Sequence, residues 1–430
     1  MEVEAPLQVG LAEIDITPWL GIELSGYGFF LDRKGTSVRE PLLAQAIAFE
    51  CGGRSALIIS ADLIGFAFSE TLRLRDEISS ATGIEPSCIA LCATHTHAGP
   101  ATIFLHGCGD VDPGYMDFLS KRLVDVARLA HSRMAPARLF TAEAPLAGVA
   151  FNRTRVDGPV DDALQCLFVE DLEGNLRSVL TRFSCHPVVF RNDNTGISPD
   201  FVGYFRSALR AQWPGALPIY LQGACGDLNP NVSEYQGPPE VAVQGVGLAV
   251  AGGVLGLFGK RRPLSVDALS GATKVIDLPF AALSSEMVDA FAHRIAPPPE
   301  RTGIAAAGAR RFAQDAQAIF IPKIEQRDLP NVDRVELQQL GLGPLTMLFH
   351  GAELFSAPAI ALRERVEGLW IVGYSNDFWG YLPDLVDFER NGYAAVTVPY
   401  MVNKPPYEPD VGERWVELAA SFLHRDVDQR

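Results

Sequence analysis

Hydrophobic positions along the chain follow two periods, and together they predict alternating strands and helices. Continuous or alternating apolar runs bounded by turn residues predict strands at 7–16, 43–50, 55–63, 88–91, 137–142, 164–170, 177–185, 218–222, 345–349 and 369–373. Apolar residues at helical spacing predict helices over 69–81 and 115–134, and a further helix from about Asp200. This alternation predicts a layered α/β domain with mixed sheets.

The organisation of the chain indicates one domain over residues 1–430. It contains no internal repeat, low-complexity tract or flexible linker, and 48% of its residues are hydrophobic, which is enough to bury a large core. Residues 265–335 carry strand and helix signals but no candidate chemistry, and Pro297-Pro298-Pro299 predicts a surface turn there.

One stretch has the composition of a membrane span. Val241–Gly259 contains a single clearly polar residue, Gln244, and is followed by three basic residues. We predict a buried, glycine-rich helix and no membrane span, because one span here would separate histidines in the N-terminal half from acidic and aromatic candidates in the C-terminal half.

Charge and cysteine usage exclude several classes of partner and site. The formal net charge of −16, from 52 acidic and 36 basic residues spread along the chain, argues against nucleic acid or anionic lipid as a partner. The seven cysteines are odd in number and form no CxxC pair, which argues against a disulfide framework or a thiolate zinc site. The acidic N-terminus lacks the features of a secretory signal, so we expect a cytoplasmic protein.

The most informative motif is Cys92-Ala93-Thr94-His95-Thr96-His97-Ala98-Gly99-Pro100, which follows a short apolar run. We interpret it as the end of a buried strand that leads into a loop. Side chains two apart on a strand share a face, so His95 and His97 are expected to point into one cavity. Two readings stay open at this point, a metal site and a pair of hydrogen-bonded histidines.

Other polar residues follow separate apolar segments. His186 comes after the strand predicted at 177–185, and a glycine-containing loop, 223–231, follows the strand at 218–222. Glu353 follows the apolar run at 345–349, and Tyr381 follows the run at 369–373. Strand ends are where loops carry chemistry, so these residues join the histidines as candidates.

Taken together, these segments resemble the neutral (non-lysosomal) ceramidase family, zinc amidases that hydrolyse the N-acyl bond of ceramide. The matching segments are Val9–Thr17, Ala93–Pro100, Phe151-Asn152-Arg153, Cys185-His186-Pro187, Pro199–Tyr204, Gly226–Asn231 and Gly351-Ala352-Glu353, together with Tyr381 and Tyr393. The resemblance covers the catalytic domain in order and rough spacing, and it implies a layered mixed-sheet sandwich with flanking helices.

The resemblance also implies roles for individual residues. Zinc would be held by His95, His186, Glu353 and Tyr381. Two imidazoles, a carboxylate and a weakly held fourth position are typical of a catalytic zinc site, which would hydrolyse an N-acyl amide through metal-activated water. The reaction centre would be lined by His97 as a proton carrier, and by Arg153 and Tyr393 as donors to the developing oxyanion.

Two features depart from the family pattern. Asn229 stands where ceramidases carry a serine that meets the reacting end of ceramide, and an amide side chain cannot be a nucleophile. The chain ends at Arg430, so we expect neither the C-terminal β-sandwich domain of larger members nor their secretory signal. We therefore expect a small N-acylated substrate other than ceramide.

Alternatives remain for the site and its residues. The same site could cleave an ester or lactone, or the chain could be an inactive homologue that holds a metal and binds a ligand. His97 could be another metal ligand, and His186 could instead cap its strand. Glu353 could form a salt bridge with an arginine, and Arg153 could pair with an acid such as Asp62 or Asp200. We expect Cys225 to be a buried structural thiol.

Overall fold

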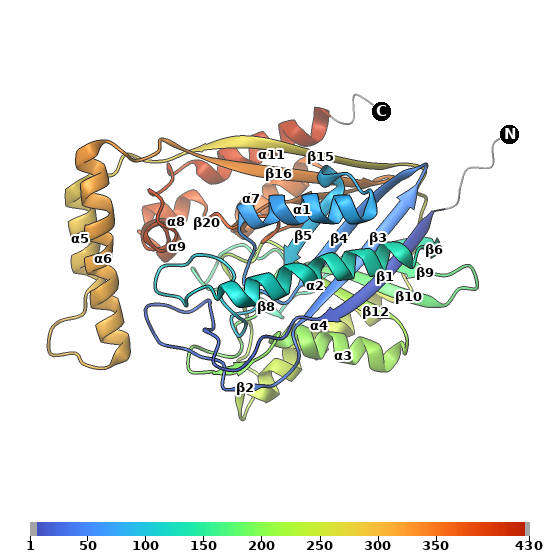
Figure 1. Ribbon diagram of the computed structural model, residues 1–430, viewed down its shortest axis with the longest axis horizontal. Helices are drawn as coiled ribbons and strands as arrows, with labels where there is room; N and C mark the ends of the chain where they lie inside the picture. The colour runs from blue at the N-terminus through green and yellow to red at the C-terminus, as the bar shows by residue number, and fades with distance from the viewer. Residues whose placement is uncertain (1–6, 426–430) are drawn as a thin grey trace.

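The computed structural model describes residues 7–425, which form three main sheets surrounded by helices (Figure 1). The first sheet has the order β5-β4-β3-β1-β6, the second β12-β10-β9-β7-β14, and the third β15-β16-β17-β19. Each contains antiparallel pairs together with one parallel pair: β4–β5, β10–β12 and β17–β19. The predicted α/β class with mixed sheets is confirmed.

Ten of the fourteen strands in the main sheets lie at or near the predicted apolar runs, and the other four, β6, β14, β15 and β16, lie outside them. The first sheet consists of β1 (Gln8–Asp15), β3 (Leu43–Cys51), β4 (Arg54–Ala61), β5 (Ile89–Ala93) and β6 (Ala135–Pro136). The second consists of β7 (Arg138–Pro145), β9 (Ala163–Glu170), β10 (Leu176–Phe183), β12 (Leu217–Gln222) and β14 (Arg262–Leu264). The third consists of β15 (Leu269–Pro279), β16 (Val332–Leu342), β17 (Leu345–Phe349) and β19 (Trp370–Val372).

Three short two-stranded sheets complete the strand set. They are β2 (Ser37–Val38) with β11 (Gly196–Ile197), β8 (Ala150–Asn152) with β13 (Leu228–Pro230), and β18 (Ala352–Leu354) with β20 (Gly380–Leu382). These short strands carry or adjoin several candidate site residues, so they matter more for function than their length suggests.

The predicted hairpin at 43–63 illustrates how local sequence determines the fold. Cys51 at the end of β3 pairs with Arg54 at the start of β4, so the turn consists of Gly52 and Gly53 alone. Both glycines have positive φ, +58° and +75°, which is the conformation that a two-residue turn with the twist of the strands requires.

Helices cover the sheets on their outer faces. The helices are α1 (Phe68–Thr82), α2 (Pro113–Ser132), α3 (Phe201–Gln212), α4 (Pro239–Phe258), α5 (Ser285–Ile295), α6 (Ile304–Gln326), α7 (Ser356–Arg365), α8 (Leu385–Glu389), α9 (Tyr393–Val396), α10 (Val398–Met401) and α11 (Val411–Arg425). In Figure 1, α1 and α2 lie across the first sheet, while α3 and α4 lie beside the second.

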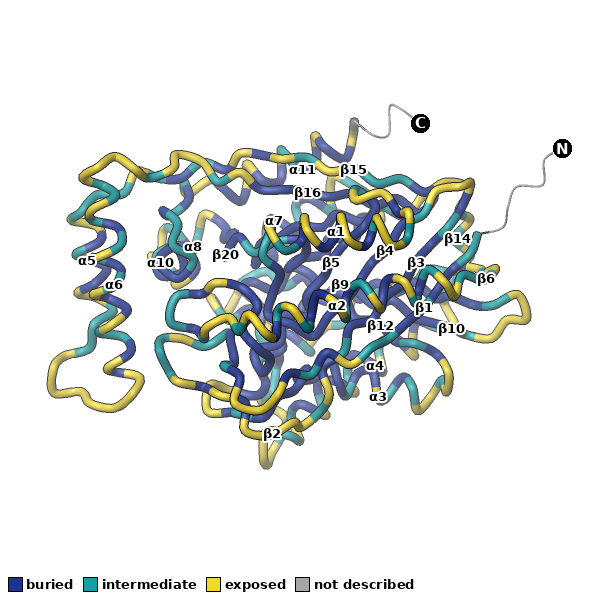
Figure 2. Tube along the Cα trace, viewed as in Figure 1, coloured by how far each residue is buried: buried dark blue, intermediate teal, exposed yellow. Residues whose placement is uncertain are grey.

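The first two sheets enclose the main core, and polar side chains also join them. Ser60 of β4 donates to the Tyr220 carbonyl of β12 at 2.6 Å, and Gln45 of β3 donates to the Pro218 carbonyl at 2.9 Å. Both side chains are buried, and the surrounding cluster of buried apolar residues draws on both sheets. Figure 2 shows this buried centre, with the exposed positions on helix faces, loops and the outer strands around it.

Helix α4 is buried along one face only. It is long and apolar enough to cross a membrane by length and composition, and 39% of its most apolar window is buried. The buried face packs on α3 so closely that a Cβ on Gly247 would lie 2.6 Å from the Phe201 carbonyl oxygen. Val241, Leu248 and Leu255 are exposed on the other face, so the predicted burial holds for one face of the helix.

Residues 265–335 form two long strands and a helical hairpin. β15 and β16 pair along their whole length and lead to α5 and α6, which project at one edge of the molecule (Figure 1). The turn predicted at Pro297–Pro299 lies between the two helices. The inner face of the hairpin packs against Ile103, Leu105 and Val398.

Candidate metal centre

His95 and His97 lie in the loop after β5, beyond the end of the strand. The strand ends at Ala93, and His95 has a left-handed backbone with φ of +67°. The backbone N–H groups of Thr94 and His95 donate to the carbonyls of Ala61, the last residue of the neighbouring strand β4, and of Leu63, just beyond it. The prediction that the two histidines share a strand face is therefore wrong, although their Nε2 atoms do converge, at 3.1 Å.

His186 enters the same cluster from the end of β10. Its ring centroid lies 4.9 Å from that of His95 and 5.4 Å from that of His97. One ligand atom from each of the three buried histidines lies within 4.8 Å of the others, an arrangement that could hold a metal ion. The structure thus brings together three imidazoles from two different sheets.

Glu353 completes the cluster from β18. Its Oε2 lies 3.2 Å from His186 Nε2 and 3.4 Å from His95 Nε2, and the side chain is buried. Among the described residues, its ion-pair contacts are with these two histidines and not with an arginine, so the salt-bridge alternative fails. Tyr381 is the register partner of Glu353 in the parallel pair β18–β20, which places both side chains together.

The hydrogen bonds of the imidazoles separate two histidines from the third. His95 Nδ1 lies 2.6 Å from the Ile64 carbonyl, and His186 Nδ1 lies 2.7 Å from the Cys225 carbonyl. A carbonyl only accepts, so both Nδ1 atoms carry the proton and both Nε2 atoms offer a lone pair to the cluster. His97 Nδ1 is buried without a partner, so its tautomer is not fixed in this way.

The electrostatics of the cluster favour neutral His97 and His186 beside an ionised Glu353. Burial, reinforced by the neighbouring His95 and His186, holds the pKa of His97 well below its usual value. Burial likewise lowers the pKa of His186 to about 4. For Glu353 burial acts in the opposite direction, but the attraction of His95 and His186 in their protonated forms outweighs it and keeps the pKa of this carboxyl well below its usual value.

Arg153, Tyr381 and Asn229 form a second polar group next to the carboxylate. Arg153 donates to the Tyr381 hydroxyl at 2.6 Å, to the Gly226 carbonyl at 2.8 Å and to Asn229 Oδ1 at 3.4 Å. Asn229 and Phe151 are register partners in the pair β13–β8, which brings Asn229 beside the segment that carries Arg153. Asp62 pairs with Arg206 instead, so the pairing of Arg153 with Asp62 is wrong.

Asp200 does not pair with Arg153 either, because backbone groups occupy it. Its carboxylate accepts hydrogen bonds from the Phe190 and Phe201 N–H groups, at 2.9 and 2.7 Å, and caps α3. Its backbone has a positive φ of +57°. Burial raises the pKa of this carboxyl to about 6. Asp200 therefore fixes the loop after His186 and is not a counter-ion in the centre.

Tyr393 lies at the rim of this group. Its ring centroid is 6.2 Å from that of Tyr381, and 51% of the residue is exposed. Its hydroxyl lies 3.0 Å from the Met401 sulfur. Among the predicted site residues, Tyr393 is the most exposed, so it lies at the protein surface beside Tyr381.

Several residues that the sequence analysis did not single out shape the centre. Tyr374 stacks on the His95 ring, with centroids 4.0 Å apart, and its hydroxyl lies 3.1 Å from Cys225 Sγ. Tyr27 meets the His97 ring edge-on at 5.0 Å. Gly26 has φ of +98°, and a Cβ there would lie 2.4 Å from His97 Nδ1.

Of these three residues, only Tyr374 had a sequence signal, since it directly follows an apolar run. Cys225 is fully buried, as expected of a structural thiol, and its backbone carbonyl orients His186. His186 uses its ring for this bond and not as a strand cap.

Comparison with known proteins identifies relatives of the chain. No family model matches it. A neutral ceramidase from Pseudomonas aeruginosa is 25% identical over 256 residues, which cover 54% of this chain and 38% of the relative. Neutral ceramidase B from Dictyostelium discoideum is 26% identical over 260 residues, covering 53% of this chain and 36% of the relative. The match thus spans less than two fifths of each curated relative.

Solved structures extend the similarity to the fold as a whole. The crystal structure of the Pseudomonas aeruginosa neutral ceramidase superposes with a TM-score of 0.74 and 20% identity, over 96% of this chain and 73% of that one. A structure described as a ceramidase complexed with C2 also gives 0.74, with 18% identity, over 98% of this chain and 76% of that one. The chain is therefore similar to neutral ceramidases in sequence over about half its length, and it has the fold of their solved structures over nearly all of it.

Proposed function

We propose that the chain is a zinc-dependent hydrolase that cleaves an N-acyl amide bond in a small substrate. The observation that carries the proposal is the meeting of His95 Nε2, His186 Nε2 and Glu353 Oε2, with contacts of 3.2 and 3.4 Å between carboxylate and imidazoles. All three atoms are hydrogen-bond acceptors in a buried space, so a cation between them is needed to offset their repulsion.

The donor set fits zinc. Tetrahedral zinc with bonds of about 2.0–2.1 Å to nitrogen and oxygen places neighbouring donors about 3.3 Å apart. The carboxylate–imidazole contacts of 3.2 and 3.4 Å lie close to this spacing, and His186 Nε2 is buried without a hydrogen-bond partner. The Nδ1 bonds from His95 and His186 to backbone carbonyls are of the kind that orients zinc-bound histidines in proteins.

In this proposal Tyr381 is the fourth, weaker ligand, and His97 is not bound to the metal. Tyr381 is brought to Glu353 by strand register. His97 lacks the Nδ1 bond that orients His95 and His186, which is the reason for separating their roles.

The remaining residues supply proton transfer and charge stabilisation. When bound, zinc would acidify a water molecule and polarise the substrate carbonyl. His97, neutral near pH 7 because burial lowers its pKa, accepts a proton at a ring nitrogen and returns it to the leaving nitrogen. Arg153, held by Gly226 and Tyr381, presents its guanidinium toward the developing negative charge. Tyr393 at the rim is the second proposed donor.

The proposed substrate differs from the one named in the relatives. The relatives are named ceramidases. In this chain Asn229 Oδ1 faces Arg153 at 3.4 Å, and an amide at this position supplies no nucleophilic hydroxyl. The proposal therefore relies on water as the nucleophile and on a smaller or more polar N-acylated molecule.

Two measurements test the proposal. Metal analysis of the purified chain is expected to find one zinc per protein in wild type and little in His95→Ala and His186→Ala. Absence of stoichiometric zinc in wild type would reject the site. A hydrolysis screen over N-acyl amides, esters and lactones, with and without chelator, is expected to show chelator-sensitive amide cleavage.

Turnover restricted to esters or lactones would move the activity to those bonds. No turnover on any substrate, together with bound zinc, would indicate a binding protein.

A further inference from the structure

Gln222, the last residue of β12, is fully buried, and its side-chain amide joins the two segments that carry His95 and His186. Nε2 donates to the Thr94 carbonyl at 3.1 Å and to the Cys185 carbonyl at 2.8 Å. Oε1 accepts from the Cys185 N–H at 3.2 Å. Thr94 and Cys185 directly precede the two histidines, so one amide fixes the backbone next to both.

The same residue also reaches the other loops of the centre. Gln222 Oε1 accepts from the Gly223 N–H at 3.2 Å, at the start of the loop that leads to Cys225 and Asn229. The Gln222 backbone carbonyl accepts from the Gly373 N–H at 3.0 Å, and Gly373 precedes Tyr374, which stacks on His95. Four chain segments that contribute to the centre therefore meet at Gln222.

This junction matters because the two histidines come from different sheets. β5 belongs to the first sheet and β10 to the second, so no strand ladder among the described residues sets the distance between His95 and His186. A primary amide can donate and accept at the same time, with bonds of defined length and direction. The Gln222 amide therefore sets the spacing between segments of the two sheets, as ladder hydrogen bonds set the spacing of strands within one sheet.

We infer that Gln222 is a positioning residue that sets the separation of the His95 and His186 imidazoles, and through it the affinity of the centre for zinc. The inference rests on the proposed function, because it assumes that these two histidines bind the metal. Residues that orient metal ligands typically contribute about 10- to 100-fold to metal affinity.

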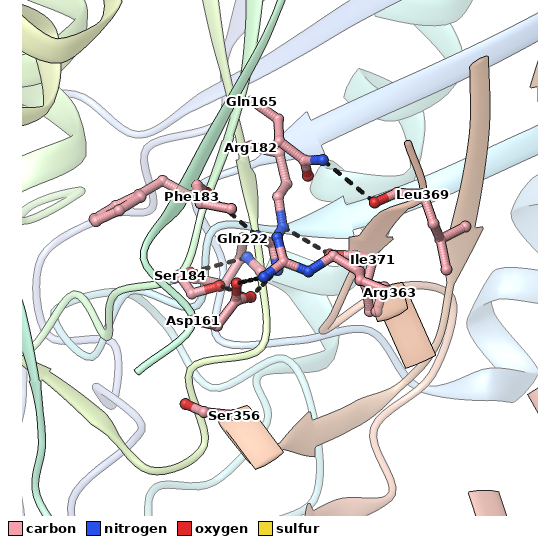
Figure 3. Close-up of polar contacts among 12 residues, drawn as sticks. Asp161, Gln165, Arg182, Phe183, Ser184, Gln222, Ser356, Arg363, Leu369 and Ile371 are labelled. Carbon is pink, nitrogen blue, oxygen red and sulfur yellow. Dashed lines mark hydrogen bonds and ion pairs between the residues drawn. The ribbon is translucent and has the colours of Figure 1, made fainter. Parts of the chain in front are cut away.

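A second buried glutamine provides a matched control. Gln165 lies on β9 and is as buried as Gln222, and its Nε2 donates to Glu143 at 2.8 Å and to the Leu369 carbonyl at 3.2 Å. Figure 3 labels both glutamines and draws the bond to Leu369. Neither bond of Gln165 touches a segment next to a proposed ligand, so losing them costs stability without moving the histidines.

The test compares Gln222→Met with Gln165→Met, because methionine keeps the length of the side chain and removes its polar atoms. The zinc dissociation constant is measured by competition with a chelator, and the melting temperature is measured on the zinc-free chain. Both variants are expected to melt lower than wild type, whereas only Gln222→Met raises the zinc dissociation constant, by about 10- to 100-fold. Unchanged zinc affinity in Gln222→Met, or an equal loss in Gln165→Met, would overturn the inference.

Gln222→Glu is the second variant and decides the case if Gln222→Met does not fold. It keeps an acceptor for the Cys185 and Gly223 N–H groups but removes both donated bonds, so zinc affinity is expected to fall about tenfold. Wild-type affinity in this variant overturns the inference. A wild-type chain without zinc overturns the proposed function itself, which distinguishes the two failures.

Discussion

The candidate metal centre and a second buried polar cluster differ in where their positive charge comes from. This other cluster, which we call the Asp161 ion cluster, consists of Asp161, Arg182, Ser184 and Arg363 (Figure 3). Arg182 pairs with one Asp161 oxygen, to which Ser184 also donates at 2.8 Å, and Arg363 lies 2.6 Å from the other oxygen. Burial opposes ionisation of this carboxyl, but the two arginines outweigh it and lower its pKa.

In the metal centre the carboxylate of Glu353 faces imidazoles instead of guanidinium groups. The Nε2 atoms of His95 and His186 approach it at 3.4 and 3.2 Å, and their Nδ1 protons are already used by backbone carbonyls. In the Asp161 ion cluster, the positive charge comes from the arginine side chains of the protein itself. In the candidate metal centre, a bound proton or metal ion has to supply it. The comparison teaches that a buried acid surrounded by acceptors marks a site for an exchangeable cation.

Removing the acid of the metal centre should have the largest effect. Glu353→Gln keeps the size of the side chain but removes its charge, so zinc affinity is expected to fall by more than about 100-fold, beyond the effect of an orienting residue, and hydrolysis to be lost with it. Zinc titration with activity assays measures both. The control is Glu336→Gln, which removes a buried acid paired with Arg75 at 2.7 Å and should keep wild-type zinc affinity. Tight zinc binding by Glu353→Gln would contradict the comparison.

Removing the acid of the Asp161 cluster should act on stability instead. Asp161→Asn leaves the buried Arg182 and the partly buried Arg363 without this counter-charge, which is expected to lower the free energy of unfolding by about 3–5 kcal/mol. Denaturant unfolding measures this, with the exposed Asp125→Asn as a control expected to stay within about 0.5 kcal/mol of wild type. Zinc content of the folded variant should remain stoichiometric, and its loss would show that the two clusters are not separable.

Replacing the arginine beside the centre tests whether its geometry matters beyond its charge. Arg153→Lys keeps the charge but cannot bond Gly226, Tyr381 and Asn229 together, so kcat/KM is expected to fall about 100-fold with zinc retained. Steady-state kinetics and metal analysis measure the two effects. The matched control is Arg155→Lys, since Arg155 pairs with Asp384 at 2.7 Å outside the centre. Equal losses in both variants would reject a specific role for Arg153.

A buried histidine outside both clusters gives the smallest effect. His350 is fully buried, with its Nδ1 accepting from the Ala352 N–H at 3.2 Å, and burial lowers its pKa to about 3. The unfolded chain binds a proton at this residue below about pH 6.5, while the folded chain does not until about pH 3, so stability falls as pH decreases between these values.

For this group alone, the free energy of unfolding of the zinc-free chain should be about 2 kcal/mol lower at pH 5 than at pH 7. His350→Asn, whose amide oxygen can replace Nδ1 as an acceptor, should lack this part of the pH dependence. Denaturant unfolding at the two pH values checks the difference, and identical pH profiles for variant and wild type would contradict it.

Sequence patterns predicted several elements whose apolar periodicity is strong, whereas the longest strands, β15 and β16, and the longest helix, α6, received no bounds. The strands that became β3, β9 and β12 and the helices that became α1 and α2 lie close to their predicted positions. Strands of three residues, such as β18 and β20, are too short to show a period, and their pairing depends on contacts between distant segments. The resemblance to a family, not periodicity, pointed to Glu353 and Tyr381 on these strands.

For the candidate site, residue types could be predicted but their orientation could not. The backbone of His95 is left-handed, and no glycine next to it in the sequence indicates such a conformation. The groups that orient His95 and His186 are the carbonyls of Ile64 and Cys225, and every residue has a carbonyl, so the sequence carries no sign of them. In the sequence, Gln222 is likewise a single polar residue at the end of an apolar run. Its hydrogen-bond partners are visible only in the structure.

The meeting of β5, β10, β12 and β18 at one place has a consequence for how the chain folds. His95 and Tyr381 lie far apart in the sequence, and contacts of this range form slowly because long loops must close first. The proposed set of zinc donors is therefore expected to be complete only after the sheets have joined, late in folding. Zinc added during refolding is expected to slow the unfolding rate while leaving the folding rate nearly unchanged.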